Sequence, residues 1–112
     1  MPSKATLVKA IKAASIYIEM RGYIVLEQNW SLGKNKIDII ASKGNCIYFI
    51  EVDVHEPNSA GFSIVDQTKI NKIKSAAGSW LQENKWAKPY SYSSIIVDEK
   101  MNILSFNADL SY

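Results

Sequence analysis

The sequence predicts one α/β domain in which helices pack on a mixed sheet, with the elements in the order α-β-β-β-α-β-β. Three observations predict this fold class. The 112 residues are close to the commonest domain size. Two segments repeat apolar residues at helical spacing. The remaining segments are rich in β-branched and aromatic residues and are separated by turn residues. We therefore treat residues 1–112 as a single domain.

The first half of the chain predicts a helix followed by three strands. Ser3 is a good N-cap and Gly22 is a good residue just beyond a helix end, so the helix lies between them. A strand follows over residues 23–32, and residues 33–35 form a turn. Strands over residues 36–41 and 46–54 then flank a second turn and form a hairpin.

The second half predicts a loop, a helix and a closing hairpin. Pro, Asn, Ser and Gly mark residues 55–63 as a loop. Asp66 caps a helix that reaches about Glu83, and strands over residues 90–97 and 102–106 close the chain. Because the second and third strands are apolar on both faces, we expect them at the centre of the sheet. The exposed edge near the C-terminus leaves pairing with a second copy open, as a homodimer.

The composition is that of an ordinary globular protein. Thirteen basic and eleven acidic residues give a net charge of +2, which permits a nucleic-acid partner where lysines cluster. The single cysteine, Cys46, excludes an internal disulfide and suits a reducing compartment. No apolar run is long enough to span a membrane, and the N-terminus lacks a signal-peptide pattern. We expect a cytoplasmic protein that does not contact membranes.

Four charged residues stand on the two central strands. Lys36 and Asp38 share one face of the second strand, and Glu51 and Asp53 share one face of the third. A turn at residues 44 and 45 would place Asp38 opposite Glu51 and Lys36 opposite Asp53. A turn at residues 43 and 44 would instead place Lys36 opposite Glu51. In both registers the four side chains lie within direct or diagonal reach.

Two carboxylates on adjacent strands form a hard-oxygen site of the kind that Mg²⁺ or Mn²⁺ prefers. Such an ion can polarise a phosphate and generate a hydroxide nucleophile. A lysine beside it can offset charge in the transition state, so these are the parts needed for phosphodiester hydrolysis. An ion-pair ladder at the end of a sheet is the alternative interpretation. His55, just beyond the acids, could contact phosphate or act as a base, or it is an exposed loop residue.

Several short motifs occur in a characteristic order along most of the chain. In the first helix they are Ala14, Tyr17, Ile18, Gly22 and Tyr23, and in the first strand Asn29 and Trp30. Ile37–Ala41 reads I-D-I-I-A, and Phe49–Val52 reads F-I-E-V. Val65, Lys69, Ala77 and Leu81 fit the second helix, and Asn107 and Ala108 fit a tail motif. In these residues the sequence resembles the YraN family of small endonuclease-like proteins. The family's fold is that of the restriction-endonuclease superfamily, whose active site is written PD-(D/E)xK.

The chain also departs from the family pattern around the site. Asp53 stands where the family has the lysine of E-V-K, and Lys36 stands where it has the glutamate of G-E-I-D. Asn35 replaces the glycine of that motif, and Ile11 replaces a first-helix glutamate. Ser31 and Ser93 replace a family arginine and a family aspartate. Lysine and acid are therefore exchanged between the two strands.

The resemblance implies a Mg²⁺- or Mn²⁺-dependent nuclease that acts on DNA, and analogy with the superfamily suggests branched DNA. Asp38 and Glu51 would hold the metal, with the carbonyl of Val52 as a further ligand. Lys36 would be the displaced catalytic lysine and Asp53 an auxiliary acid. The lysines that could contact DNA phosphates are Lys34, Lys69, Lys72 and Lys74. The alternative is a catalytically degenerate protein of the same fold that binds DNA or a protein partner.

Overall fold

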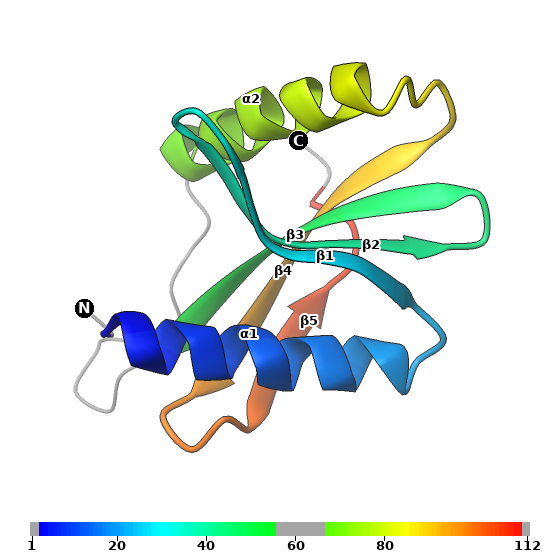
Figure 1. Cartoon of the computed structure of the whole chain (residues 1–112). Coiled ribbons are helices and arrows are strands. Elements are labelled where there is room, and N and C mark those ends of the chain that lie inside the picture. Colours follow the sequence, from blue (N-terminus) through cyan, green and yellow to red (C-terminus); the bar gives the residue numbers. More distant parts are fainter. Residues whose placement is uncertain (1–2, 56–66, 111–112) are drawn as a thin grey trace.

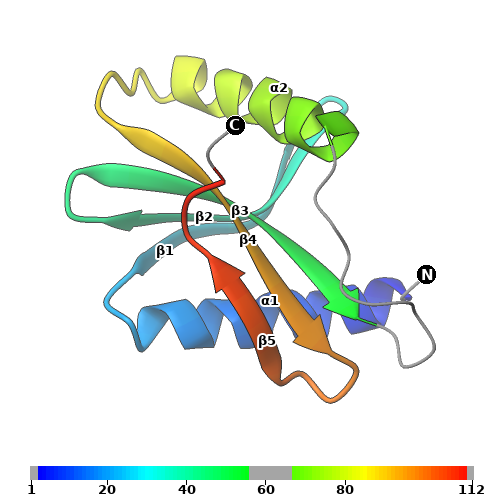
Figure 2. The same cartoon turned by 180° about the vertical axis from the view of Figure 1, so that it is seen from behind.

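The computed structural model describes residues 3–55 and 67–110, which form a five-stranded mixed sheet with a helix on each face (Figures 1 and 2). The predicted fold class and element order are confirmed. The elements are α1 (Lys4–Glu19), β1 (Ile24–Leu32), β2 (Asn35–Lys43), β3 (Cys46–His55), α2 (Gln67–Glu83), β4 (Tyr90–Asp98) and β5 (Ile103–Asn107). No helix in the described part of the chain is long and apolar enough to cross a membrane.

The strands follow the order β1-β2-β3-β4-β5 across the sheet. The first three form an antiparallel meander, β4 pairs parallel with β3, and β5 pairs antiparallel with β4. The parallel pair requires a crossover, which includes α2. As expected, β2 and β3 lie inside the sheet and the C-terminal strand lies at an edge.

The turn between β2 and β3 fixes the register of the charged residues. Lys43 pairs with Cys46 and Ile39 pairs with Ile50, so the turn is at residues 44 and 45. Gly44 has a φ of 62°, which glycine adopts without strain. This is the register that places Asp38 across from Glu51, and the alternative register is wrong.

Each face of the sheet carries its own apolar cluster. On one face α1 packs against β2, β3 and β4, with Ile39, Ile50 and Val97 fully or almost fully buried. On the other face α2 packs against β1, β2 and β3, with Phe49 at the centre and Trp80 from the helix. The helix that carries Lys69 and Lys72 is therefore held against the strands that carry the acids.

The sheet splits between β2 and β3. Their pairing runs from the turn only as far as Ile39 and Ile50, although β1 and β2 stay paired to their own turn at Leu32 and Asn35. Beyond the split, the β1–β2 hairpin curves towards α2 while β3 continues in the opposite direction beside β4 (Figure 1). Asp38 and Glu51 are the first residues past the last paired positions. We call this place the fork.

The curvature of the hairpin corrects one expectation. Alternation along a flat strand would place Ile37 on the same face as Ile39. Instead Ile37 packs in the α2 cluster with Trp30, whereas Ile39 packs in the α1 cluster. The end of the hairpin curls around α2, so a side chain on the nominal α1 face is turned into the α2 cluster.

The element ends agree with the sequence to within a few residues. The Ser3 hydroxyl accepts a 3.1 Å hydrogen bond from the backbone N–H of Thr6, as expected of an N-cap. His55 is the last residue of β3 and is half-buried, so the expectation of an exposed loop histidine is wrong. The cap assigned to Asp66, the motif residue Val65 and most of the expected loop lie outside the described residues.

Candidate functional site

Asp38 lies on β2 at the fork and joins the two strands there. Its Oδ2 accepts a 2.8 Å hydrogen bond from the backbone N–H of Val52 on β3. A side chain thus satisfies a strand N–H where the backbone pairing has ended. Burial raises the pKa of Asp38, and the negative charge of Asp53 adds to the effect. The bond from Val52 and the positive charge of Lys36 act in the opposite direction.

Glu51 is the acid most perturbed by its surroundings. Its pKa is raised to about 7, mainly because burial disfavours the carboxylate and then because Asp53 and Asp38 repel it. Lys69 and Lys72, both on α2, partly offset these effects. The charge of Asp53 raises the pKa of both Asp38 and Glu51, so the three acids lie near one another around the fork. Near neutral pH Glu51 therefore carries a proton for a large fraction of the time.

Asp53 faces α2. Its Oδ1 lies 3.4 Å from the ammonium nitrogen of Lys69, and the Asp53 side chain is 17% exposed whereas that of Lys69 is 35% exposed. Its Oδ2 is buried and has no hydrogen-bond partner among the described residues. A buried carboxylate oxygen without a partner is costly, so this atom is suited to a water molecule or a cation.

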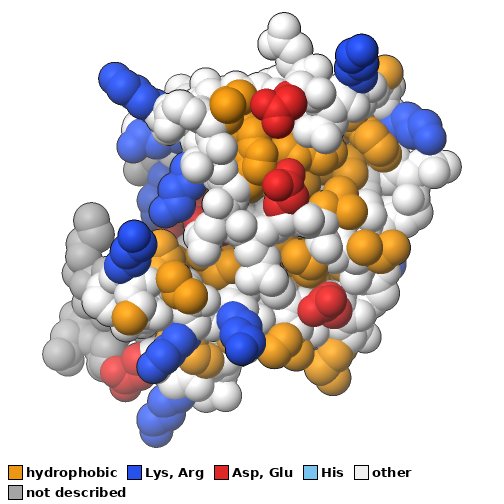
Figure 3. Space-filling model, in the orientation of Figure 1, with side chains coloured by type: hydrophobic (Ala, Val, Ile, Leu, Met, Phe, Trp, Pro, Cys, Tyr) orange, Lys and Arg blue, Asp and Glu red, His pale blue; other side chains and the backbone are white. Residues whose placement is uncertain are grey.

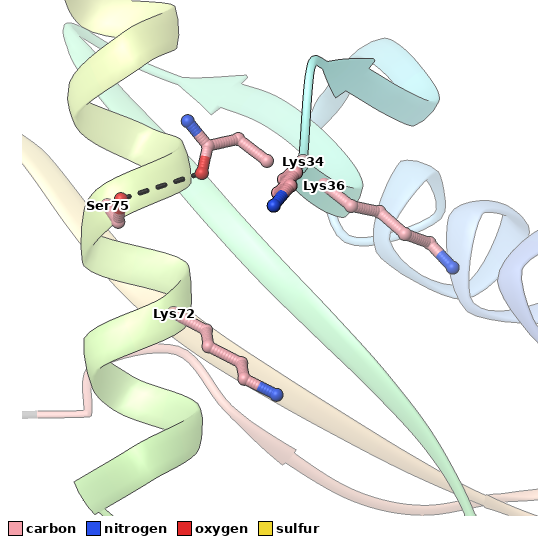
Figure 4. A pocket seen from close by; sticks show the side chains of 5 residues that line it. Lys34, Lys36, Lys72 and Ser75 are labelled. Carbon is pink, nitrogen blue, oxygen red and sulfur yellow. Dashed lines mark hydrogen bonds between the residues drawn. The ribbon is translucent and has the colours of Figure 1, made fainter.

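A hollow adjoins the fork between the tip of the β1–β2 hairpin and α2. Its volume is about 280 Å³, and its lining residues are Lys34, Asn35, Lys36, Lys72 and Ser75. Figure 4 shows Lys34 and Lys36 arising from the hairpin and Lys72 projecting from the helix. In the space-filling view, lysine and arginine side chains gather on the side of the molecule where the hairpin meets α2 (Figure 3).

The structure does not bring all of the predicted lysines together. Lys34, Lys36 and Lys72 line the hollow, and Lys69 contacts Asp53. Lys74 is exposed and is not among the lining residues. Sequence reasoning counted Lys69 only as a DNA contact and missed its contact with an acid. Its position three residues before Lys72 places both on one face of α2, but nothing in the sequence shows that this face meets Asp53.

Two departures from the family pattern are accommodated structurally. Ile11, at the first-helix glutamate position, is buried in the α1 cluster, so α1 supplies no acid there. Ser93, at the aspartate position, is also buried, and its hydroxyl donates a 2.7 Å hydrogen bond to the carbonyl of Ala108. Ile11 therefore serves the packing of α1, and Ser93 holds the segment around Ala108 that follows β5.

Within residues 3–55 and 67–110, no three His, Cys, Asp or Glu side chains are grouped closely enough to hold one metal ion. Mg²⁺ is commonly held by only one or two carboxylates, with waters and a substrate phosphate completing its shell. The pair of Asp38 and Glu51 is sufficient in number for such a site.

The described elements define the class of this protein as a small mixed α/β protein with acidic side chains where its central strands separate. The family model described as "Uncharacterised protein family UPF0102" matches residues 12–105. The chain belongs to this family, which is the YraN family that its motifs resemble.

Curated relatives carry the same family description. The chain is 37% identical to a UPF0102 protein of Cytophaga hutchinsonii over 75 residues, or 65% of this chain and 66% of that protein. It is 35% identical to one of Dictyoglomus thermophilum over 62% of this chain and 60% of that protein. It is 31% identical to one of Aliarcobacter butzleri over 85% of this chain and 88% of that protein. The first two matches thus span less than two thirds of those relatives.

Proposed function

We propose that this protein is a Mg²⁺-dependent nuclease that cleaves DNA, with Asp38 and Glu51 as the residues that hold the metal. The observation that carries the proposal is the placement of Asp38, Glu51 and Asp53 around the fork, where the charges of Asp53 and Asp38 disfavour the carboxylate form of Glu51. Acids that repel one another in a partly buried place are stabilised by a divalent cation. Branched DNA as the substrate rests on analogy with the superfamily.

The donor groups fit such an ion. The Val52 bond occupies Oδ2 of Asp38 and holds the carboxylate in place, so Oδ1 is the oxygen we assign to the metal. Oδ2 of Asp53 lacks a partner among the described residues and would reach the ion only through water, because no three described acids are grouped closely enough to hold one ion. The Val52 carbonyl stays the proposed backbone ligand. When bound, the ion would polarise the phosphate and acidify a water molecule.

Two lysines flank the acids and supply positive charge. Lys36 acts on Asp38 from β2, and Lys69 acts on Glu51 and contacts Asp53 from α2. Lys36 stays the proposed replacement for the lysine that the family has at position 53. Lys69 is a second lysine in reach of the acids, and its role is to hold Asp53 in its orientation. Both ammonium groups would stabilise negative charge on a phosphate at the fork.

The test is cleavage of plain and branched DNA in Mg²⁺ or Mn²⁺. Asp38→Asn and Glu51→Gln preserve side-chain size and should each reduce cleavage at least about 100-fold, because each removes a charge that would hold the ion. Lys36→Met should reduce cleavage to a similar extent, whereas Lys69→Met should have a smaller effect. Cleavage that is unaffected by either acid substitution would identify a contaminating nuclease and refute the proposal.

A catalytically degenerate protein that binds DNA or a protein partner is the second candidate. Two observations favour it: Asp53 occupies the family's lysine position, and the first-helix glutamate position is a buried isoleucine. This candidate predicts that the wild-type protein binds DNA and cleaves none of the substrates in either metal.

A further inference from the structure

The hollow between the hairpin tip and α2 has the charge of an anion site. Among the described residues, its lining consists of three lysines with Asn35 and Ser75, and none of these is an acid. Its volume of about 280 Å³ is just below that of typical pockets for drug-sized ligands. That size suits a phosphate group with part of a sugar better than a whole nucleoside.

Hydrogen bonds fix the shape of the hollow. The side-chain amide of Asn35 donates a 2.7 Å bond to the Ser79 hydroxyl, and the Ser75 hydroxyl donates a 3.5 Å bond to Oδ1 of Asn35. The second of these bonds is drawn in Figure 4. Because they tie the hairpin tip to α2, Lys34 and Lys72 arise from two backbones that are held together. Binding then requires ordering of the side chains alone, which reduces its entropic cost.

The hollow is next to the fork but separate from it. Lys36 precedes Asp38 by two residues on β2, and the positive charge of Lys72 lowers the pKa of Glu51. The acids themselves are not part of its lining. An anion in the hollow would therefore lie beside the proposed metal site without displacing the metal.

We infer that the hollow binds a backbone phosphate of the DNA strand next to the phosphate that is cleaved at the fork. The identification of the ligand as DNA rests on the proposed function. Asn35 and Lys36 are both departures from the G-E-I-D motif, in which an acid stands at position 36. In this chain Lys36 stands at that position, so the lining of the hollow gains a positive charge where the family motif has a negative one. The site holds the strand in register, as phosphate contacts do, without reading its sequence.

The experiment measures binding of a mixed-sequence DNA duplex by fluorescence anisotropy in EDTA, where no cleavage occurs, at several salt concentrations. Lys34→Ala and Lys72→Ala should each weaken binding roughly three- to tenfold. Each should also lower the slope of log K against log salt by about one, and the double variant should lower it by about two. Lys74→Ala is the matched control: the sequence predicts a phosphate contact for Lys74 too, but this residue lies on the same helix outside the hollow, so the inference gives it no such contact. Its effect should be less than about twofold.

The inference is overturned if Lys34→Ala and Lys72→Ala bind DNA as the wild type does, or if Lys74→Ala loses as much as Lys72→Ala. Tighter binding of inorganic phosphate alone than of DNA would assign the hollow to a free anion and also overturn it. The outcome is separable from that of the proposed function. If the wild type binds DNA through Lys34 and Lys72 but never cleaves it, the phosphate site in the hollow stands and the proposed nuclease activity is refuted. If the wild type cleaves DNA but substitution of either lysine leaves binding unchanged, the nuclease activity stands and the phosphate site is refuted. If the wild type binds no DNA, both proposals fail.

Discussion

The backbone N–H of Val52 donates a 2.8 Å hydrogen bond to Oδ2 of Asp38, at the point where β2 and β3 separate. This bond gives Asp38 a structural role that is distinct from its proposed role as a metal ligand. Asp38→Ala should leave the Val52 N–H without its partner and lower the free energy of unfolding by about 1–3 kcal/mol. Asp38→Asn keeps an acceptor oxygen and should lower it by less, as measured by urea denaturation of both variants.

The two variants should differ in stability but lose the same function. Both remove the carboxylate charge, so both should abolish Mg²⁺ binding. Equal stability of Asp38→Ala and Asp38→Asn would show that the bond to Val52 contributes nothing to the fold.

The raised pKa of Glu51 makes stability depend on pH. Its folded pKa of about 7 exceeds the ordinary value of 4.5, so the folded state binds more protons between these values. The free energy of unfolding should therefore fall as pH rises from about 4.5 through about 7. Glu51→Gln should remove this loss of stability. At pH 8 it should be more stable than the wild type by about 1–2 kcal/mol. This is less than the full pKa shift implies, because water reaches part of the carboxyl group.

The measurement is urea denaturation of the wild type and Glu51→Gln at pH 4.5, 6 and 8. Glu83→Gln is the control, because it removes one negative charge from an exposed position near the end of α2. A difference between wild type and Glu51→Gln that stays constant with pH would contradict the assignment of the titration to Glu51.

Mg²⁺ should stabilise the folded protein through the same carboxylates. At a concentration ten times its Kd the ion should add about 1.4 kcal/mol to the free energy of unfolding. The gain should be larger at pH 8 than at pH 5.5, because the ion competes with the proton on Glu51. Thermal unfolding with and without Mg²⁺ tests this directly. Asp38→Asn and Glu51→Gln should show no such gain, and if they do, the ion binds elsewhere.

A hydrogen bond that involves none of the fork acids supplies a contrasting prediction. The indole N–H of Trp80 on α2 donates a 2.9 Å hydrogen bond to Oε2 of Glu27 on β1, where the strand is bulged. Trp80 is almost fully buried, so Glu27→Ala should cost about 1–3 kcal/mol of stability. Glu27→Gln retains an acceptor and should cost less. Neither substitution should alter the stabilisation by Mg²⁺, and denaturation in both conditions checks this.

The features that the sequence predicts well are those that depend on neighbouring residues. The turn residues around Gly44 predict the β2–β3 hairpin, and the alternation of side chains along its strands predicts that Asp38 lies near Glu51. Ser3 was recognisable as a cap from its residue type and its place before a helical pattern. Family resemblance singled out the same acids, but only the structure gives their surroundings.

The features that were missed depend on contacts between distant segments. Ile37 turns into the α2 cluster because the hairpin curls around α2, a helix that begins only at Gln67. The contact of Lys69 with Asp53 likewise requires α2 to dock on the sheet. Periodicity within a strand or helix carries no information about how two such elements meet.

The parallel pairing of β3 with β4 has a consequence for the order in which the site is assembled. Asp38 and Glu51 meet through a hairpin closed by two residues, which costs little loop entropy. Lys69 and Lys72 reach them only after the longer crossover is in place, and such non-local pairing is slow. We therefore expect Asp38 and Glu51 to come together during folding with Lys36 already on the same hairpin but before Lys69 and Lys72 arrive, and a transient detachment of α2 would remove these two lysines from Glu51 again.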